Sequence, residues 1–189
     1  SNMDSAIANG MIVYVWNDSR GGTRYSIQDE VSGSFLVSDV ELIANGAGDS
    51  HRCITANNNV IIFYANGNDL EFKLIKSGDP CATPTTGSTI RPDVHADHIM
   101  DFTTIGNSVY AFYKSSTAGE AQLAIINSNG VFQQEITLTE TVDDVLSIYA
   151  YTNVALSTTY LNLIWKEDAN TIKGKIHKQF LGEEVATLT

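Results

Sequence analysis

Apolar residues recur along this chain in a repeating order. Largely apolar five-residue runs that end in Trp or Tyr lie at residues 12–16, 60–64, 109–113 and 161–165. A polar turn follows each run, and then a segment in which apolar and polar residues alternate. The terminal aromatics are 48, 49 and 52 residues apart, close to the ~40 to 50 residues of a propeller blade. The spacing predicts four structural repeats.

Each repeat divides into four short segments joined by turns. The turns contain Gly, Asn and Asp, which tolerate the positive φ of tight hairpins, so the segments are expected to form antiparallel strands. No window of helical length shows a 3.6-residue apolar period, and we expect essentially no long helix. The prediction is a single repeat domain over residues 6–189, with approximate units 6–45, 46–91, 92–141 and 142–189.

The second and third segments of a unit differ in pattern. Residues 60–64 are continuously apolar, whereas Leu70, Phe72 and Leu74 alternate with polar neighbours. A strand covered on both faces is continuously apolar, and a strand with one wet face alternates. A second strand held between neighbouring blades, followed by a third nearer the rim, produces this gradient. The pattern predicts an all-β fold, a β-propeller of four four-stranded blades. A β-sandwich is the alternative. In a sandwich, the second and the third strand of a unit would both alternate between apolar and polar residues.

The beginning of the chain departs from the repeat. The first strand of unit one is only a stub around residues 6–9, so we expect the first blade to be incomplete. A closed propeller often has one blade that combines strands from the beginning and the end of the chain. The sequence shows no such blade, so we expect the chain to be a segment of a longer protein. Residues 1–2 resemble the remnant of an expression tag. The aromatics that end the runs share one position in every unit, which predicts a packing role for Trp16, Tyr64, Tyr113 and Trp165.

The charge excludes some partners. Eleven Lys and Arg against twenty-two Asp and Glu give a net charge of −11, which disfavours nucleic acid and anionic membranes as partners. No stretch approaches the ~18 apolar residues of a membrane span. Turns after the second strands and connections between units should meet on one face, which we expect to be acidic: Asp18, Asp49, Asp69, Asp93, Asp97, Glu120, Asp143, Asp144, Glu167 and Asp168. We interpret these acids as turn-capping groups rather than a cation site.

Cysteines and histidines give no metal signature. Cys53 and Cys81 are too few for a zinc site or a disulfide framework, and we expect free thiols, with a bridge between them left open. The four histidines are His51, His95, His98 and His177. The pair at 95 and 98 lacks a third ligand at a defined spacing, so we expect a surface loop, no metal and no cofactor.

Two short motifs suggest hydrolases. Gly48-Asp49-Ser50 resembles the nucleophile block of GDS-type esterases, but no helix follows, and Asp93 and His95 do not have the spacing of that family's later Asp-x-x-His. Residues 17–25 resemble the Asp-box of sialidases, although the motif does not recur in the other units. The chain has four arginines, Arg20, Arg24, Arg52 and Arg91, all in its first half. Neither motif supplies a catalytic set, so no catalytic residue is predicted and ligand-binding residues stay unassigned.

The repeats as a whole resemble those of large structural proteins of tailed-bacteriophage virions and of bacterial surface proteins. Residues 59–75 and 106–128 carry this resemblance. It implies a location in a virion or on an extracellular surface, with other protein segments of the same assembly as partners. We therefore predict a non-enzymatic structural or binding module. The alternative is a carbohydrate-binding or sialidase-like glycan-active propeller module, with a surface glycan as partner.

Overall fold

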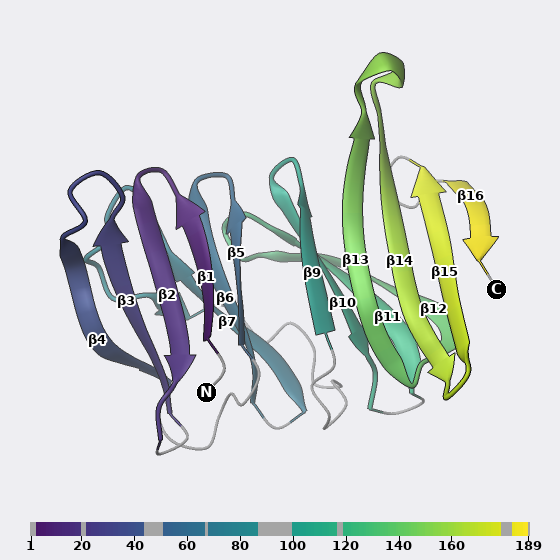
Figure 1. The fold of residues 1–189 in the computed structure, drawn as a ribbon, viewed down its shortest axis with the longest axis horizontal. Helices are drawn as coiled ribbons and strands as arrows, with labels where there is room; N and C mark the ends of the chain where they lie inside the picture. Colours follow the sequence, from purple (N-terminus) through teal and green to yellow (C-terminus); the bar gives the residue numbers. More distant parts are fainter. Residues whose placement is uncertain are drawn as a thin grey trace.

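The computed structural model describes residues 3–19, 22–43, 51–66, 68–86, 100–116, 119–178 and 183–188. Within them the chain is all-β, with sixteen strands in four separate four-stranded antiparallel sheets (Figure 1). Each sheet consists of four strands that are consecutive in sequence. The predicted propeller of four four-stranded blades is confirmed. The sandwich alternative is wrong, because the strands form four separate sheets rather than two stacked ones.

The strands have the following bounds. Blade 1 contains β1 (Met3–Ala8), β2 (Met11–Asn17), β3 (Thr23–Asp29) and β4 (Phe35–Ile43). Blade 2 contains β5 (His51–Ala56), β6 (Asn59–Asn66), β7 (Asp69–Ile75) and β8 (Thr85–Thr86). Blade 3 contains β9 (Met100–Ile105), β10 (Ser108–Lys114), β11 (Glu120–Asn127) and β12 (Phe132–Thr141). Blade 4 contains β13 (Asp144–Asn153), β14 (Thr158–Asp168), β15 (Thr171–Lys178) and β16 (Glu183–Leu188).

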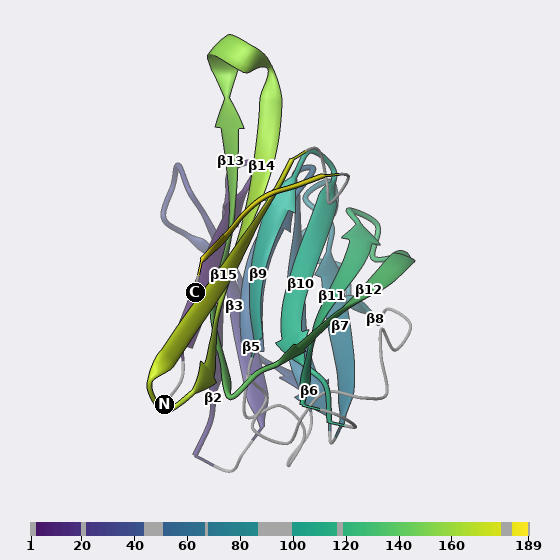
Figure 2. The same ribbon diagram turned by 90° about the vertical axis from the view of Figure 1, so that its right-hand side faces the viewer.

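The first blade is complete, which corrects the prediction of an incomplete one. β1 pairs with β2 over its whole length, from Met3 opposite Trp16 to Ala8 opposite Met11. The polar residues Asp4 and Ser5 interrupt the apolar pattern of this strand, so the sequence does not predict its full length. The strand forms because it pairs with β2. A short 3₁₀ turn, η1 (Val154–Leu156), is the one helical element among the described residues. It closes the β13–β14 hairpin, which extends beyond the other blades in both views (Figure 1 and Figure 2).

Neighbouring blades pack face to face through three apolar clusters. We call the face of a blade that carries its terminal aromatic the leading face, and the opposite one the trailing face. The leading face of blade 4 packs on blade 3 through Leu161, Leu163 and Trp165. The leading faces of blades 2 and 3 pack in the same way on blades 1 and 2. The second strands of the two inner blades are accordingly buried, with the exposed fraction at most 3% across residues 60–64. In the end blades, β2 and β14 alternate between buried and half-buried residues.

The third strands follow the predicted gradient only in part. Leu70, Phe72 and Leu74 of β7 are buried while Glu71 and Lys73 are half-buried. In β11, by contrast, residues 121–126 are all buried. Leu123 and Ile125 face the cluster with blade 4, and Ala124 and Ile126 face the cluster with blade 2. Blade 3 is therefore covered on both faces as far as its third strand.

The four blades stand in a row, with blades 1 and 4 at its two ends (Figure 1). Contacts between successive blades are made mainly by the first strands β1, β5, β9 and β13. Among the described residues, the leading face of blade 1 and the trailing face of blade 4 contact no other blade. Trp16 lies on the leading face of blade 1 and is half-buried, whereas Tyr113 and Trp165 are fully buried at the same repeat position.

Candidate functional site

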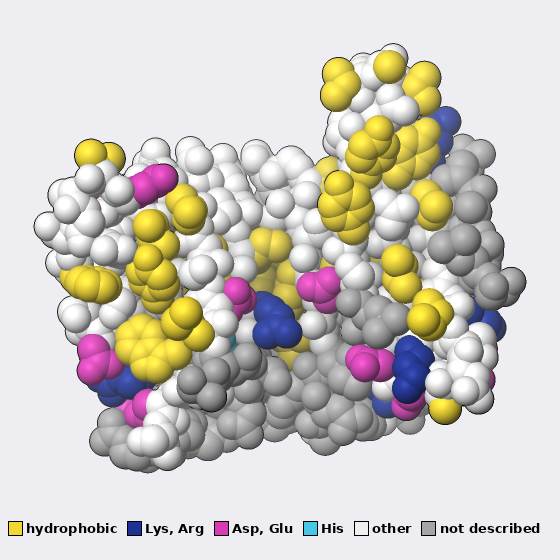
Figure 3. All heavy atoms as spheres, in the orientation of Figure 1, with side chains coloured by type: hydrophobic (Ala, Val, Ile, Leu, Met, Phe, Trp, Pro, Cys, Tyr) yellow, Lys and Arg dark blue, Asp and Glu magenta, His cyan; other side chains and the backbone are white. Residues whose placement is uncertain are grey.

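The first strands of blades 1, 2 and 3 carry charged side chains at one repeat position. Asp4, Arg52 and Asp101 lie opposite Val15, Phe63 and Phe112, the buried residues that precede the terminal aromatics. The three first strands lie next to one another, which brings an acid, a base and an acid to one side of the molecule. Figure 3 shows acidic and basic side chains gathered in a hollow near the middle of this face. We call these three residues the axial row.

Both carboxylates of the axial row are held by the next blade. Asp4 Oδ2 accepts a hydrogen bond of 2.8 Å from the backbone N–H of Cys53, and Asp101 Oδ2 accepts one of 2.9 Å from the backbone N–H of Ile148. The second oxygen of Asp4 accepts from its neighbour Ser5. Within the described residues, the second oxygen of Asp101 has no hydrogen bond. The same contact thus positions two carboxylates, and Asp101 retains an oxygen that can accept from a ligand.

Arg52 is the exposed member of the row. Its Nη1 donates to the carbonyl of its neighbour His51 at 3.0 Å, and its side chain is exposed. A guanidinium has five N–H donors, so most of them point to solvent or to a ligand. The positive charge of Arg52 lowers the pKa of His51 and of the Cys53 thiol, whereas the negative charge of Asp4 raises both.

Two buried titratable groups lie behind the row. His51 is fully buried, and neither ring nitrogen has a hydrogen bond of normal geometry among the described residues. Burial lowers the pKa of His51, while the negative charge of Asp4 and the nearby backbone of Val15 oppose that shift. Burial also raises the pKa of the Cys53 thiol. Cys53 and Cys81 are both free, as expected. Both shifts favour the uncharged form of the group, and a thiol with a raised pKa is a poor nucleophile.

The row is suited to binding hydroxyl groups. Carboxylates accept hydrogen bonds and a guanidinium donates them, so alternating acids and a base present both functions on neighbouring first strands. A metal site is not built here. In the part of the chain that the structure describes, no three His, Cys, Asp or Glu side chains form a group able to hold a metal ion.

Most of the candidate catalytic and metal-binding residues singled out from the sequence lie outside the part of the chain that the structure describes. Gly48, Asp49, Ser50, Asp93, His95, Asp97, His98, Arg20 and Arg91 lie outside the described residues. Of the remaining histidines, His51 is buried in blade 2 and His177 is buried in blade 4. No helix in the described part of the chain is long and apolar enough to cross a membrane.

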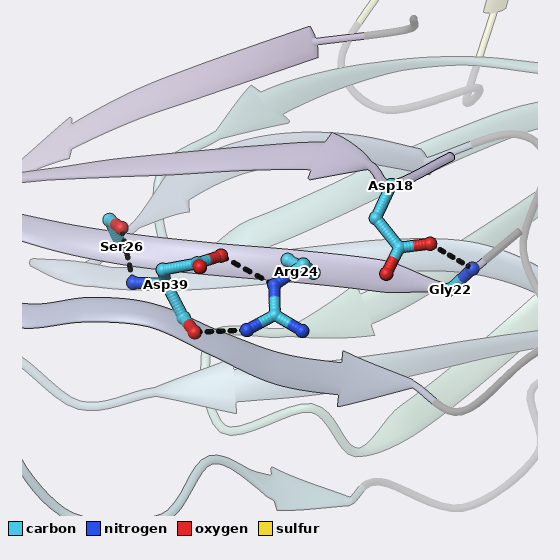
Figure 4. A network of polar contacts seen from close by, with 5 residues as sticks. All are labelled: Asp18, Gly22, Arg24, Ser26 and Asp39. Carbon is cyan, nitrogen blue, oxygen red and sulfur yellow. Dashed lines mark hydrogen bonds and ion pairs between the residues drawn. The ribbon is translucent and has the colours of Figure 1, made fainter. Parts of the chain in front are cut away.

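The segment that resembles an Asp-box forms a capped hairpin in blade 1 (Figure 4). The backbone N–H of Asp18 donates to the carbonyl of Gly22 at 2.8 Å, and the N–H of Gly22 donates to Asp18 Oδ1 at 3.0 Å. Arg24 donates to both the carboxylate and the carbonyl of Asp39, whose N–H donates to Ser26 Oγ. These contacts give Asp18 and Arg24 structural roles.

Acids at the turns of blade 4 are also engaged in local contacts. Asp143 pairs with Lys166 at 2.8 Å, and Glu167 pairs with Lys173 at 2.7 Å. The Lys166 ammonium lowers the pKa of Asp143. The backbone N–H of Asn170 and the hydroxyl of Thr171 lower the pKa of Asp168. These acids cap turns and pair with lysines, in agreement with the interpretation from the sequence.

Sequence reasoning missed the axial row. A signal was present, because Asp4, Arg52 and Asp101 are separated by 48 and 49 residues, the same spacing as the aromatics. Because the first strand of unit one is expected only around residues 6–9, Asp4 lies outside the predicted strand. The alternating sign of the charges also concealed the repeat, since no single residue type recurs.

Comparison with solved structures places the whole chain among propellers. It matches AofleA from Arthrobotrys oligospora with a TM-score of 0.64 and 11% identity, over 99% of this chain and 55% of that one. A GH43 β-1,3-galactosidase in complex with galactodeoxynojirimycin matches with a TM-score of 0.60 and 9% identity, over 98% and 74%. An exo-β-1,3-galactanase from Phanerochaete chrysosporium with β-1,3-galactotriose matches with a TM-score of 0.56 and 8% identity, over 98% and 49%.

At identities of 8–11%, the TM-scores of 0.56–0.64 establish a shared fold and nothing beyond it. The chain spans about half of the galactanase and of AofleA. No family model matches the sequence, and neither does any curated protein.

The comparisons correct the predicted function. Similar folds belong to glycoside hydrolases, which contradicts both the non-enzymatic structural module and the prediction that the chain is not an enzyme. They favour the alternative, a glycan-active propeller module. A glycan partner is consistent with two of these similar structures, the galactanase with β-1,3-galactotriose and an α-L-arabinofuranosidase from Podospora anserina in complex with cellotriose. The resemblance to virion repeats and the protein partners it implies stay predictions.

Proposed function

We propose that this chain is a carbohydrate-active propeller module that takes a neutral oligosaccharide in the hollow over its first strands. The axial row of Asp4, Arg52 and Asp101 carries the proposal. The row places hydrogen-bonding charges on three successive blades at one repeat position. The similar structures of a β-1,3-galactosidase, an exo-β-1,3-galactanase and an α-L-arabinofuranosidase also support a carbohydrate ligand.

The charge pattern selects the ligand class. An anionic sugar would meet two carboxylates and one guanidinium, so its charge would be repelled on balance. A neutral sugar can donate hydroxyl protons to Asp101 and accept from Arg52 without that repulsion. Glycoside hydrolysis uses a pair of carboxyl groups. Both oxygens of Asp4 already accept backbone N–H groups, so the row supports sugar binding more directly than hydrolysis.

Binding and turnover of defined oligosaccharides test the proposal. Calorimetric titration with β-1,3-galactotriose and cellotriose should detect binding to at least one, and chromatography of the same mixtures should reveal any shortened products. Arg52→Gln and Asp101→Asn should each weaken binding about tenfold or more, as expected for losing a hydrogen bond to a charged group. The amide oxygen introduced by Asp101→Asn can still accept from the Ile148 N–H, so the fold is retained.

Matched controls separate the row from surface charge in general. Lys76→Gln and Glu41→Gln remove exposed charges elsewhere and should leave affinity unchanged. Equal losses in the control and row variants would contradict the site. Absence of both binding and hydrolysis across a panel of neutral glycans would contradict the function itself.

A further inference from the structure

Carboxylates join successive first strands at two of the three steps between blades. The two acids of the axial row accept from the backbone N–H groups of Cys53 and Ile148 in the next blade, at 2.8 and 2.9 Å. Each donor directly follows the residue at the row's repeat position in its own blade, Arg52 or Ser147. At the step from blade 2 to blade 3 the matching donor is Phe102. Arg52 holds the row position there, and a guanidinium has no acceptor atom.

The N–H of Phe102 points away from its own sheet. β9 is the edge strand of blade 3, and its two-residue turn to β10 makes Ile105 and Ser108 a hydrogen-bonded pair. Bonded and non-bonded pairs alternate along an antiparallel ladder, so Phe102 and Ala111 form a non-bonded pair. Cys53 has the same position relative to its own turn, and its N–H does point outwards to a carboxylate. Among the described residues, no side-chain oxygen accepts from the Phe102 N–H.

Packing between blades 2 and 3 brings Arg52 to this edge. Arg52 lies opposite Phe63 on the trailing face of blade 2, and the Phe63 ring stacks on the ring of Phe102 with centroids 4.4 Å apart. In the described part of the chain, the one hydrogen bond of the Arg52 side chain goes to the His51 carbonyl. Arg52 is exposed and Phe102 is half-buried. A backbone donor and a guanidinium with spare donors therefore lie where the other two steps hold a carboxylate oxygen.

We propose that a ligand supplies the acceptor at this step, and that the acceptor is the carbonyl oxygen of an acetamido group. This ligand class rests on the function proposed above and narrows it to N-acetylated neutral sugars. An amide carbonyl oxygen has two lone pairs and no proton, so it can accept from both donors and needs no acceptor in return. A sugar hydroxyl would bring a proton to a position that offers donors. A free carboxylate would be repelled by the acids on both sides.

Two trisaccharides that differ only in their acetamido groups test this preference. Cellotriose carries hydroxyls where triacetylchitotriose, with the same β-1,4 linkage, carries acetamido groups. In calorimetric titration of the native chain, triacetylchitotriose should bind about tenfold tighter or more, as expected for an added hydrogen bond to a charged group. Equal affinities, or tighter binding of cellotriose, would overturn the acetamido preference and leave the proposed function in place. Failure of every neutral glycan to bind would contradict the proposed function and this ligand class with it.

Arg52→Asp gives this step the carboxylate that the other two steps have. The new carboxylate should accept from the Phe102 N–H and close the site, so the two trisaccharides should then bind with equal affinity. Arg52 is exposed, so the fold should be retained, which the melting temperature checks. Lys76→Asp makes the same change of charge at another exposed position and should keep the preference. Loss of the preference in both variants would assign it to overall charge and overturn the site, as would a preference that survives Arg52→Asp.

The amide resonance of Phe102 reports on the contact directly. In a chain labelled with ¹⁵N-phenylalanine, the signal that disappears in Phe102→Leu identifies it. Triacetylchitotriose should shift this signal in the native chain more than cellotriose does, and Arg52→Asp should shift it without any sugar, because the N–H then has an acceptor. Triacetylchitotriose that binds without moving the signal would lie elsewhere and overturn the site. An equal shift with sodium acetate at the same concentration would indicate a general anion site and overturn the acetamido assignment.

Discussion

The carboxylate of Asp101 on β9 accepts the backbone N–H of Ile148 on β13 at 2.9 Å and so joins blade 3 to blade 4. Asp4 makes the same contact between blades 1 and 2. Replacing Asp101 with Ala leaves a half-buried N–H without its acceptor, and we expect a loss of about 1 to 3 kcal/mol in the free energy of unfolding. Asp101→Asn should retain most of the stability. Urea unfolding of both variants measures the difference, and equal losses would show that the carbonyl oxygen cannot replace the carboxylate.

Gly130 lies against a buried ring. It has a φ of +75°, and an added Cβ would lie 2.2 Å from Cε2 of Phe72. Gly10 has a φ of +80°, and a Cβ added there would meet nothing within 4 Å. Gly10→Ala therefore measures only the cost of holding an alanine at positive φ. We expect Gly10→Ala to cost about 1 kcal/mol and Gly130→Ala to cost a further ~1 to 3 kcal/mol from overpacking. Thermal unfolding compares them, and similar losses would mean that Phe72 moves aside freely.

Trp165 and Trp16 share one repeat position in different surroundings. Trp165 is fully buried against blade 3, with its ring edge-on to Phe112 at 6.5 Å, while Trp16 is half-buried on an open face. Trp165→Ala should therefore cost about 3 to 5 kcal/mol, and Trp16→Ala in dilute solution about half as much or less. Denaturant titration at low protein concentration decides this. A larger loss at Trp16 would contradict the open face.

His51 should make stability depend on pH. Burial lowers its pKa in the folded state, below the ~6.5 of the unfolded chain. As the pH falls below that value, the unfolded chain binds a proton that the folded chain does not, so the free energy of unfolding decreases towards the folded pKa.

Replacing this imidazole removes the linkage. His51→Leu should flatten the stability profile between pH 7 and 5, measured by urea unfolding, while every other titrating group stays in place. A native-like slope in the variant would assign the dependence to other groups.

Acids at the turns should respond to salt rather than to calcium. Their mutual repulsion is screened over about 10 Å at 0.1 M salt, so the melting temperature should rise modestly as sodium chloride increases from low concentration. Calcium at constant ionic strength should have no added effect. A melting temperature that climbs with millimolar calcium and returns on chelation would demonstrate a specific site.

The sequence by itself determined the blades. Period-two alternation and hairpin turns are local properties, and they identified the second strands, the packing role of the terminal aromatics and the antiparallel order within each sheet. Residues 60–64 illustrate this, since their burial follows directly from a continuous apolar run. The partial Asp-box also indicated the glycan-active alternative, although Asp18 and Gly22 of that segment cap a hairpin.

Contacts between blades were decided only by the tertiary structure. β1 is a full strand because β2 pairs with all of it, a constraint that its own residues do not express. Asp4, Arg52 and Asp101 are separated by 48 and 49 residues in sequence, and only the packing of the first strands against one another makes them neighbours in space. The burial of the terminal aromatics likewise depends on their neighbours, since Trp16 is half-buried while Tyr113 and Trp165 at the same repeat position are fully buried. Local patterns encode what each strand buries, whereas the neighbours that bury it are a property of the assembled array.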